Sequence, residues 1–184
     1  MLTDTQKARL LEIARTSVVA RVLQQMPVPE LGCGRADPIE SMPEAYGVFV
    51  TIKRHGTLRG CLGTLENRRG LIEEVGRCAG DSASEDPRFV PVSADELPDL
   101  RVELSVLGPL EHIDPFPQAF TIGVHGLVVG QGHRRGLLLP QVATEWGWTA
   151  EQFLRQTCLK AGLPQDAWQH GADVYRFAAE VFGD

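Results

Sequence analysis

The stretch from residue 48 to residue 64 reads VFVTIKRHGTLRGCLGT and decides the fold class. Val48, Val50 and Ile52 alternate with Phe49, Thr51 and Lys53, which is the period of a strand with one buried face. His55-Gly56 is a turn signal, because glycine adopts the positive φ values that tight hairpin turns require. Residues 57–62 are expected to return as a second strand. The stretch therefore predicts an antiparallel hairpin.

The return strand contains the most unusual residues of the chain. A period of two assigns its residues to two faces: Leu58, Gly60 and Leu62 to one, and Arg59, Cys61 and Gly63 to the other. Glycine weakens the interior of a strand, so two glycines indicate a bend or the close approach of another group. A guanidinium beside a thiol favours the thiolate, so Arg59 is expected to activate Cys61 as a nucleophile or a ligand. The alternative is a tight hairpin end with a buried, inert Cys61.

Elements on both sides of the hairpin follow either the helical or the strand period. Helices are predicted over residues 3–25, 70–84 and 149–161, with shorter ones over 93–97 and 114–120. Strands are predicted over residues 100–107, 123–130, 135–139 and 173–182. Hairpins separated by helices predict an α+β fold, with a mainly antiparallel sheet flanked by helices.

Length and composition favour one globular domain. The 184 residues, of which 43% are hydrophobic, are expected to form a single domain over 1–184, with a smaller lobe over about 114–148. The net charge of −6 argues against broad nucleic-acid binding, which needs a basic surface. No run of 18 apolar residues and no signal-peptide pattern is found, so we expect a cytoplasmic protein without a membrane partner.

Four cysteines are present, and none belongs to a C-x-x-C pair. Their wide spacing indicates free thiols in a reducing compartment. Cys78 and Cys158 fall on apolar helix stripes, where burial suppresses reactivity. Cys61 is therefore predicted to be the most reactive thiol, with Cys33, in a loop, as its main competitor.

Three further residues are candidates for chemistry. Glu103 lies on the polar face of a strand, where a carboxylate could orient a base or accept a proton, or simply face solvent. His125 could be a general base or a metal ligand, although a histidine in a strand is often structural. Gln141 could hydrogen-bond a ligand, or begin a helix or loop. Together, Cys61, Glu103 and His125 supply the parts of a cysteine nucleophile site, and equally three metal ligands.

No cofactor is predicted. The chain contains no Walker loop, dinucleotide-binding fingerprint, H-E-x-x-H pattern or C-x-x-C zinc site. The spacing of the cysteines also differs from the motif that ligates the cluster of a radical SAM enzyme, so such chemistry would belong to a partner.

Several blocks of the sequence resemble the AMMECR domain family. Its signature, Leu-Arg-Gly-Cys-Ile-Gly-Thr, is matched by residues 58–64 with Leu62 in place of isoleucine. The other blocks follow in the family's order: EDPRF at 85–89, ELSVL at 103–107, GVHGL at 123–127, LPQV at 139–142, and a closing strand with YRF at 175–177 and VF at 181–182. The resemblance covers nearly the whole chain.

The resemblance implies an α+β fold with a larger lobe around an antiparallel sheet and a smaller lobe packed on it. It also implies an association with a Memo-like protein and a radical SAM protein, in which this chain would be the A component of the AmmeMemoRadiSam system. The family has no settled reaction, so two hypotheses remain. One is a cysteine-centred enzyme or enzyme-system component. The other is a non-catalytic binding module that docks a partner through Arg59, Gly60, Gly63 and Thr64, with Gln141 as a further contact.

Overall fold

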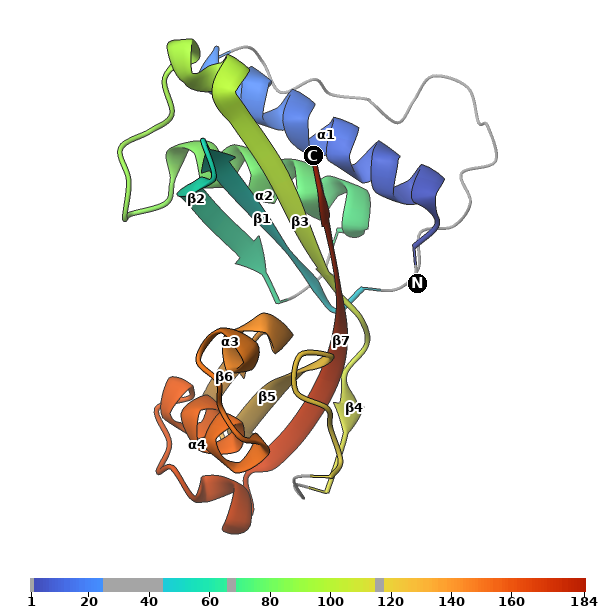
Figure 1. The fold of residues 1–184 in the computed structure, drawn as a ribbon, viewed down its shortest axis with the longest axis vertical. Coiled ribbons are helices and arrows are strands. Elements are labelled where there is room, and N and C mark those ends of the chain that lie inside the picture. The colour runs from blue at the N-terminus through green and yellow to red at the C-terminus, as the bar shows by residue number, and fades with distance from the viewer. Residues whose placement is uncertain (1, 25–44, 66–68, 115–117) are drawn as a thin grey trace. The chain divides into compact units, whose positions relative to one another are not determined.

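The computed structural model describes residues 2–24, 45–65, 69–114 and 118–184. These residues belong to two compact units, one made of residues 1–107 with 180–184 and the other of residues 108–179. Each unit combines helices with antiparallel strands, so the predicted α+β class is confirmed (Figure 1). The single-domain boundaries and the smaller lobe over 114–148 stay predictions.

The first unit is built around the predicted hairpin. Strands β1 (Gly47–Arg54) and β2 (Thr57–Thr64) are antiparallel, and His55 and Gly56 both have positive φ at the turn. Strand β3 (Leu100–Leu107) pairs with the other side of β1, which gives the order β2-β1-β3. The end of strand β7 (Asp173–Gly183) follows next to β3. Strand β2 is therefore an edge strand.

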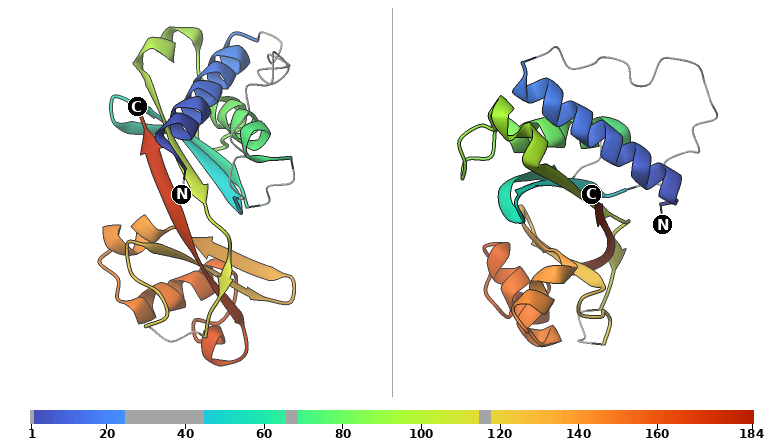
Figure 2. Two further views of the ribbon diagram at one scale, coloured as in Figure 1. Left: turned by 90° about the vertical axis from the view of Figure 1, so that its right-hand side faces the viewer. Right: turned by 45° about the horizontal axis from the view of Figure 1, so that its top comes forward.

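Two helices cover one face of these strands (Figures 1 and 2). Helix α1 (Asp4–Val22) begins at a capping box of Thr3 and Gln6, and α2 (Leu71–Ser84) lies against β1 and β2. Leu10, Ala14, Val18, Val50, Ile52, Val75, Ala79 and Leu104 are among the buried core residues. Among the described residues of this unit, α1 and α2 both lie on this face, and the opposite face of the strands carries neither.

Close packing of α2 on the hairpin explains one of the two glycines. A Cβ atom at Gly60 would meet the carbonyl oxygen of Ser82 in α2. The Ser82 hydroxyl also accepts a hydrogen bond from the Leu62 N–H at 2.8 Å and donates one to the Val50 carbonyl at 2.8 Å. Gly60 is therefore required by the approach of the helix, as the sequence indicated.

A β-bulge changes the predicted faces of β2. Ile52 pairs with Gly60 but Lys53 pairs with Leu58, so Arg59 is an extra residue on this strand. Because Arg59 is inserted between Leu58 and Gly60, the side chains before the bulge are shifted to the opposite face relative to those after it. The prediction that Arg59 shares a face with Cys61 is therefore wrong.

The second unit has its own sheet and core. Strands β5 (His125–Gln131) and β6 (Arg134–Leu138) form the second predicted hairpin, and β7 lies between β5 and the short β4 (Glu111–His112). Helices α3 (Pro140–Glu145) and α4 (Ala150–Lys160) pack on the hairpin. Phe120, Leu127, Val129, Phe153, Leu154, Cys158 and Val174 are among its buried residues.

Most predicted elements are confirmed, with small shifts at their ends. The short helix expected at 93–97 is a 3-10 helix, η1 (Ala94–Asp99), and it begins at a capping box of Ser93 and Glu96. The expected helix over 114–120 is wrong at residues 118–120, which form a turn and bends. Prolines at 115 and 117 oppose a helix there, because each lacks an N–H donor.

No helix in the described part of the chain combines the length and the apolar character that a membrane span needs.

Candidate functional site

The main chain of Cys61 is held on its outer side by two side chains. Its N–H donates to Asp86 Oδ2 at 2.8 Å, and its carbonyl accepts from Arg88 Nη2 at 3.2 Å. On an edge strand these groups would otherwise be left without a strand partner. Asp86 and Arg88 therefore replace a neighbouring strand and fix the backbone at Cys61.

Asp86 and Arg88 are also bound to each other. Arg88 Nε donates to Oδ1 at 2.9 Å and Nη2 donates to Oδ2 at 2.7 Å, while the Asp86 side chain is only 2% exposed. The hydrogen bonds from Arg88 hold the pKa of Asp86 well below its ordinary value. The pKa of Arg88 is raised, first by Asp86 and also by the neighbouring Cys61. Arg88 is thus a fixed cation within electrostatic reach of Cys61.

The thiol itself contacts a threonine on the central strand. Thr51 pairs with Cys61 in β2 and with Glu103 in β3, so the three side chains form one row across the sheet. The Thr51 hydroxyl donates to Cys61 Sγ over 3.3 Å. This row lies on the face opposite α1 and α2, because the neighbouring Val50 and Ile52 point into the helix-covered core.

Glu103 lies at the other end of the row. Lys53 Nζ donates to its carboxylate at 2.9 Å, and both side chains are about one-third exposed. Because β1 lies between β2 and β3, the main chains of Cys61 and Glu103 are two strand spacings apart, roughly 10 Å. Glu103 therefore shares a row with Cys61 and is bound to Lys53, and its role in the chemistry of Cys61 stays a prediction.

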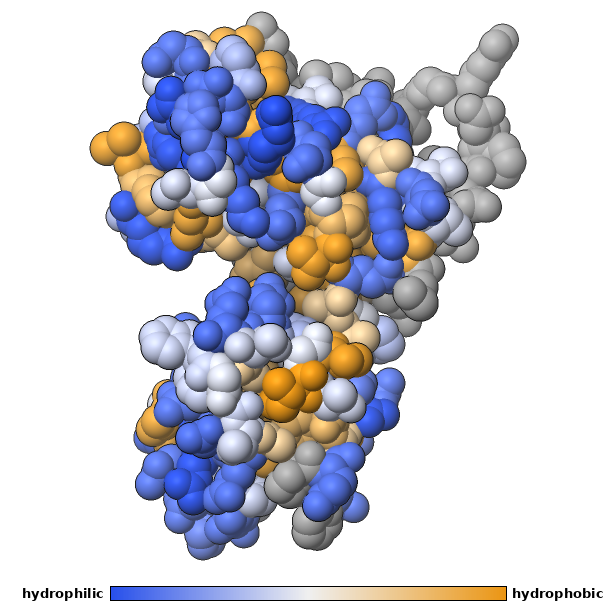
Figure 3. Space-filling model, viewed as in Figure 1, coloured by the Kyte–Doolittle hydropathy of each residue, from blue (hydrophilic) through white to orange (hydrophobic). Residues whose placement is uncertain are grey.

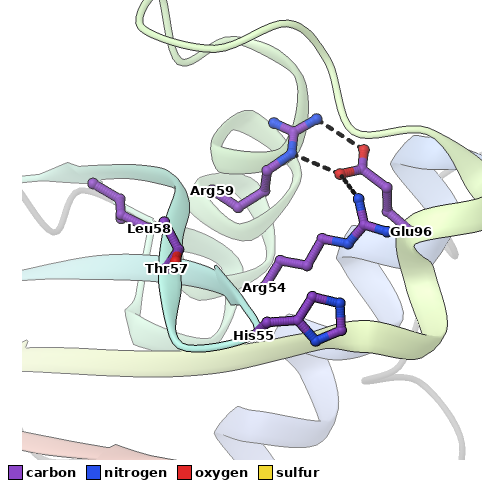
Figure 4. A pocket seen from close by; sticks show the side chains of 6 residues that line it. All are labelled: Arg54, His55, Thr57, Leu58, Arg59 and Glu96. Atoms are coloured by element: carbon purple, nitrogen blue, oxygen red, sulfur yellow. Dashed lines mark hydrogen bonds and ion pairs between the residues drawn. The ribbon is translucent and has the colours of Figure 1, made fainter.

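Arg59 takes part in a separate ion-pair cluster. Its Nε and Nη2 each donate to the Glu96 carboxylate at 2.9 Å (Figure 4). Its Nη1 donates to the Val90 carbonyl. Arg54 Nη1 binds the same carboxylate at 3.1 Å. The hydrogen bonds from Arg59, the largest cause, and from Ser93 lower the pKa of Glu96 to about 2. The bulge thus directs Arg59 towards η1, and the cation beside Cys61 is Arg88.

A shallow recess of about 410 Å³ adjoins this cluster at the hairpin turn. It is lined by Arg54, His55, Thr57, Leu58, Arg59 and Glu96 (Figure 4). Since Glu96 binds both guanidiniums and Asp99 also binds Arg54 at 3.4 Å, the positive charges here are balanced by carboxylates. The recess is not an anion site of the kind that unpaired arginines form.

Comparison with known proteins identifies the family. The AMMECR1 family model matches residues 11–182. The chain belongs to the AMMECR1 family. The match confirms the resemblance drawn from residues 58–64 and the blocks that follow them.

AMMECR1-type relatives extend over most of the chain. A protein of Methanothermobacter thermautotrophicus is 47% identical over 78% of this chain and 80% of its own length. A protein of Methanosarcina barkeri is 40% identical over 99% of this chain and 92% of its own length. The crystal structure of uncharacterized protein PH0010 from Pyrococcus horikoshii matches with a TM-score of 0.81 at 39% identity, covering 95% of this chain and 89% of that one.

Two predicted site residues of this AMMECR1-family chain lie in the second unit. The Thr121 N–H donates to His125 Nδ1 at 3.0 Å, and the pKa of His125 is lowered by burial and by Arg176. The Nδ1 of His125 is therefore an acceptor, and its surroundings favour the uncharged ring. Gln141 lies in the first turn of α3. Because His125 and Cys61 belong to different units, their convergence stays a prediction.

The cysteines of the described residues differ in their surroundings. Cys78 and Cys158 are fully buried, and burial raises the pKa of Cys78 to about 11 and also raises the pKa of Cys158. Cys61 is half-buried, and Cys33 lies outside the described residues. The described thiols thus follow the predicted order of accessibility.

Sequence reasoning missed Thr51, Asp86 and Arg88 as site residues. The alternation along β1 assigns Thr51 to one face of its strand. Only the register shows that Thr51 lies directly opposite Cys61. Asp86 and Arg88 stand in the family block EDPRF, to which the sequence alone assigns no role in the site. The family block was the one available signal for this pair.

Proposed function

We propose that this chain acts through a reactive thiol at Cys61, as one component of an enzyme system that includes a Memo-like and a radical SAM protein. The observation that supports it is the way Cys61 is held. Asp86 and Arg88 fix its main chain, while its sulfur lies on the helix-free face of the first unit's strands, in contact with Thr51. An inert structural cysteine needs neither a clamped backbone nor a hydrogen-bond donor at its sulfur.

The proposed chemistry is nucleophilic attack. The Cys61 thiol releases its proton to solvent, and the thiolate forms an S–C bond to an electrophilic carbon, whose leaving group departs with the bonding electron pair. The electrophile is a small molecule or a group on a partner protein. Asp86 and Arg88 hold the main chain of Cys61, so the strand keeps its place while the sulfur reacts.

Alkylation of the native protein tests this function. Iodoacetamide forms an S–C bond to the thiolate and releases iodide, and mass spectrometry after proteolysis reads each cysteine separately. Across pH 5 to 9 we expect Cys61 to be labelled fastest among the four thiols, with Cys78 and Cys158 labelled only after unfolding. If Cys61 stays unlabelled in the native protein while Cys33 reacts, Cys61 is structural.

The second candidate function is a binding module that uses the glycine-rich hairpin. It is favoured by Leu58 and Val90, apolar side chains that are exposed near the ion-pair cluster of Arg59. Apolar side chains lie in small groups among hydrophilic ones on the face seen in Figure 3, which is less than a broad docking surface. An unreactive Cys61 in the labelling experiment would favour this alternative.

A further inference from the structure

Thr51 lies in the most constrained part of the first unit. It belongs to β1, which is paired on both sides, to β2 at Cys61 and to β3 at Glu103. The opposite face of β1 is buried under the helices at Val50 and Ile52. A threonine side chain has few χ1 rotamers, because two heavy atoms branch from Cβ. The position of the Thr51 hydroxyl is therefore set by the fold.

The Thr51 hydroxyl donates its proton to the sulfur of Cys61. Within the part of the chain that the structure describes, the hydrogen bond of the Thr51 hydroxyl is to Cys61 Sγ, at 3.3 Å. The neighbouring polar side chains of this face have other partners, since Lys53 and Glu103 bind each other. Thr51 is thus the side chain placed to donate to the sulfur.

We propose that Thr51 is a positioning residue for the reactive sulfur of Cys61. Its hydroxyl holds the thiol in one rotamer and donates to the thiolate that forms on ionisation. This inference rests on the proposed function, because it assigns a residue that supports the same thiol.

Two separate sets of hydrogen bonds then hold Cys61, one at its main chain and one at its sulfur. Asp86 and Arg88 bind the N–H and carbonyl of Cys61, so they fix its main chain, while the side-chain torsion is set by the contacts of the sulfur itself. Thr51 binds the sulfur and so fixes that torsion. A hydrogen bond to the charged form of an acid favours ionisation, and a thiolate is a stronger acceptor than a thiol. The Thr51 hydroxyl is therefore expected to affect both the fraction of Cys61 that is ionised and the direction in which its sulfur points.

The test compares three variants by the pH dependence of Cys61 alkylation. Thr51→Val removes the hydroxyl and keeps the branched shape, whereas Thr51→Ser keeps the hydroxyl. We expect Thr51→Val to slow the labelling of Cys61 at pH 7 roughly tenfold and to move the pH midpoint upwards by about one unit. Thr51→Ser should stay within about twofold of the parent chain. Thr57→Val, a matched change on the same hairpin, should have no effect on Cys61.

Thermal unfolding of each variant separates folding from chemistry, and Thr51→Ala serves as a second hydroxyl-free variant if Thr51→Val does not fold. Unchanged labelling in a folded hydroxyl-free variant would overturn the role of Thr51 and leave the proposed function standing. Equal slowing in Thr51→Val and Thr51→Ser would show that packing, not the hydroxyl, matters. If Cys61 of the parent chain is unreactive, the proposed function itself fails.

Discussion

Replacing Glu96 with alanine is expected to lower the free energy of unfolding by about 3–5 kcal/mol, the cost of breaking a buried ion pair from one side. The carboxylate binds two guanidiniums, those of Arg59 and Arg54, and also accepts a hydrogen bond from the Ser93 N–H. The side chains of Glu96 and Arg59 are only 10% and 14% exposed, so water cannot replace these contacts. Urea denaturation at pH 7 measures the loss.

The effect of Glu96 has a defined pH dependence. Its pKa falls from 4.5 to about 2 on folding, so the unfolded chain binds the proton more readily. Its contribution to stability is therefore complete above about pH 4.5 and is lost as the pH falls towards 2. The difference between the parent chain and Glu96→Gln should shrink over this interval. A difference that stays constant from pH 7 to pH 2.5 would contradict the ionic role of Glu96.

Asp99→Asn provides a matched control for the Glu96 variants. Asp99 binds Arg54 over 3.4 Å, and its side chain is 39% exposed. Exposed pairs of this kind contribute less than about 1 kcal/mol, so this variant should unfold close to the parent chain.

Replacing Asp86 with alanine is expected to cost about 3 kcal/mol of stability, and also to disturb Cys61. The change removes the acceptor of the Cys61 N–H and leaves the Arg88 guanidinium without its carboxylate partner. Since Asp86 accepts from the Cys61 N–H and holds Arg88 at the Cys61 carbonyl, we also expect the rate of Cys61 alkylation to change. Urea denaturation and alkylation of the same samples measure the two effects.

Coupling between Asp86 and Arg88 can be isolated with a double-mutant cycle. Arg88→Ala alone and the Asp86→Ala/Arg88→Ala pair complete the cycle, and the losses should be less than additive, because the second change removes a partner already lost. Additive losses would show that the two side chains act independently. Arg69→Ala, which removes an exposed arginine bound to Glu73 over 3.8 Å, should leave both stability and Cys61 unchanged.

The fold could be predicted where a long segment follows one period. Strand β3 agrees with its predicted bounds, and α2 and α4 differ from theirs by one residue at the N-terminal end, with α4 also ending one residue early. Two short elements were not predicted. Helix α3 has six residues and β4 has two, which is too few to establish a period. Such elements form because of tertiary contacts rather than local preference.

The candidate site was predictable only in part, for a related reason. The glycines around Cys61 identified the residue, but the cation beside it was assigned to Arg59, its neighbour in sequence. A single extra residue at the bulge turned Arg59 away, and Arg88, 27 residues distant, took the place. The partners of a side chain across strands depend on register, which local sequence periodicity does not specify.

Strand β7 has a consequence for the order in which the chain folds during synthesis. Residues 108–179 form the second unit as one continuous segment, whereas the first unit also needs residues 180–184. Asp184 binds the Val102 N–H at 2.7 Å, and Glu180 binds the Leu2 N–H at 2.8 Å. A ribosome therefore releases all of the second unit before it releases the last part of the first. In a chain that stops at residue 179, amide exchange should stay slow in the second unit and become faster in α1 and β3. During synthesis from the N-terminus, the second unit would then finish folding before the first.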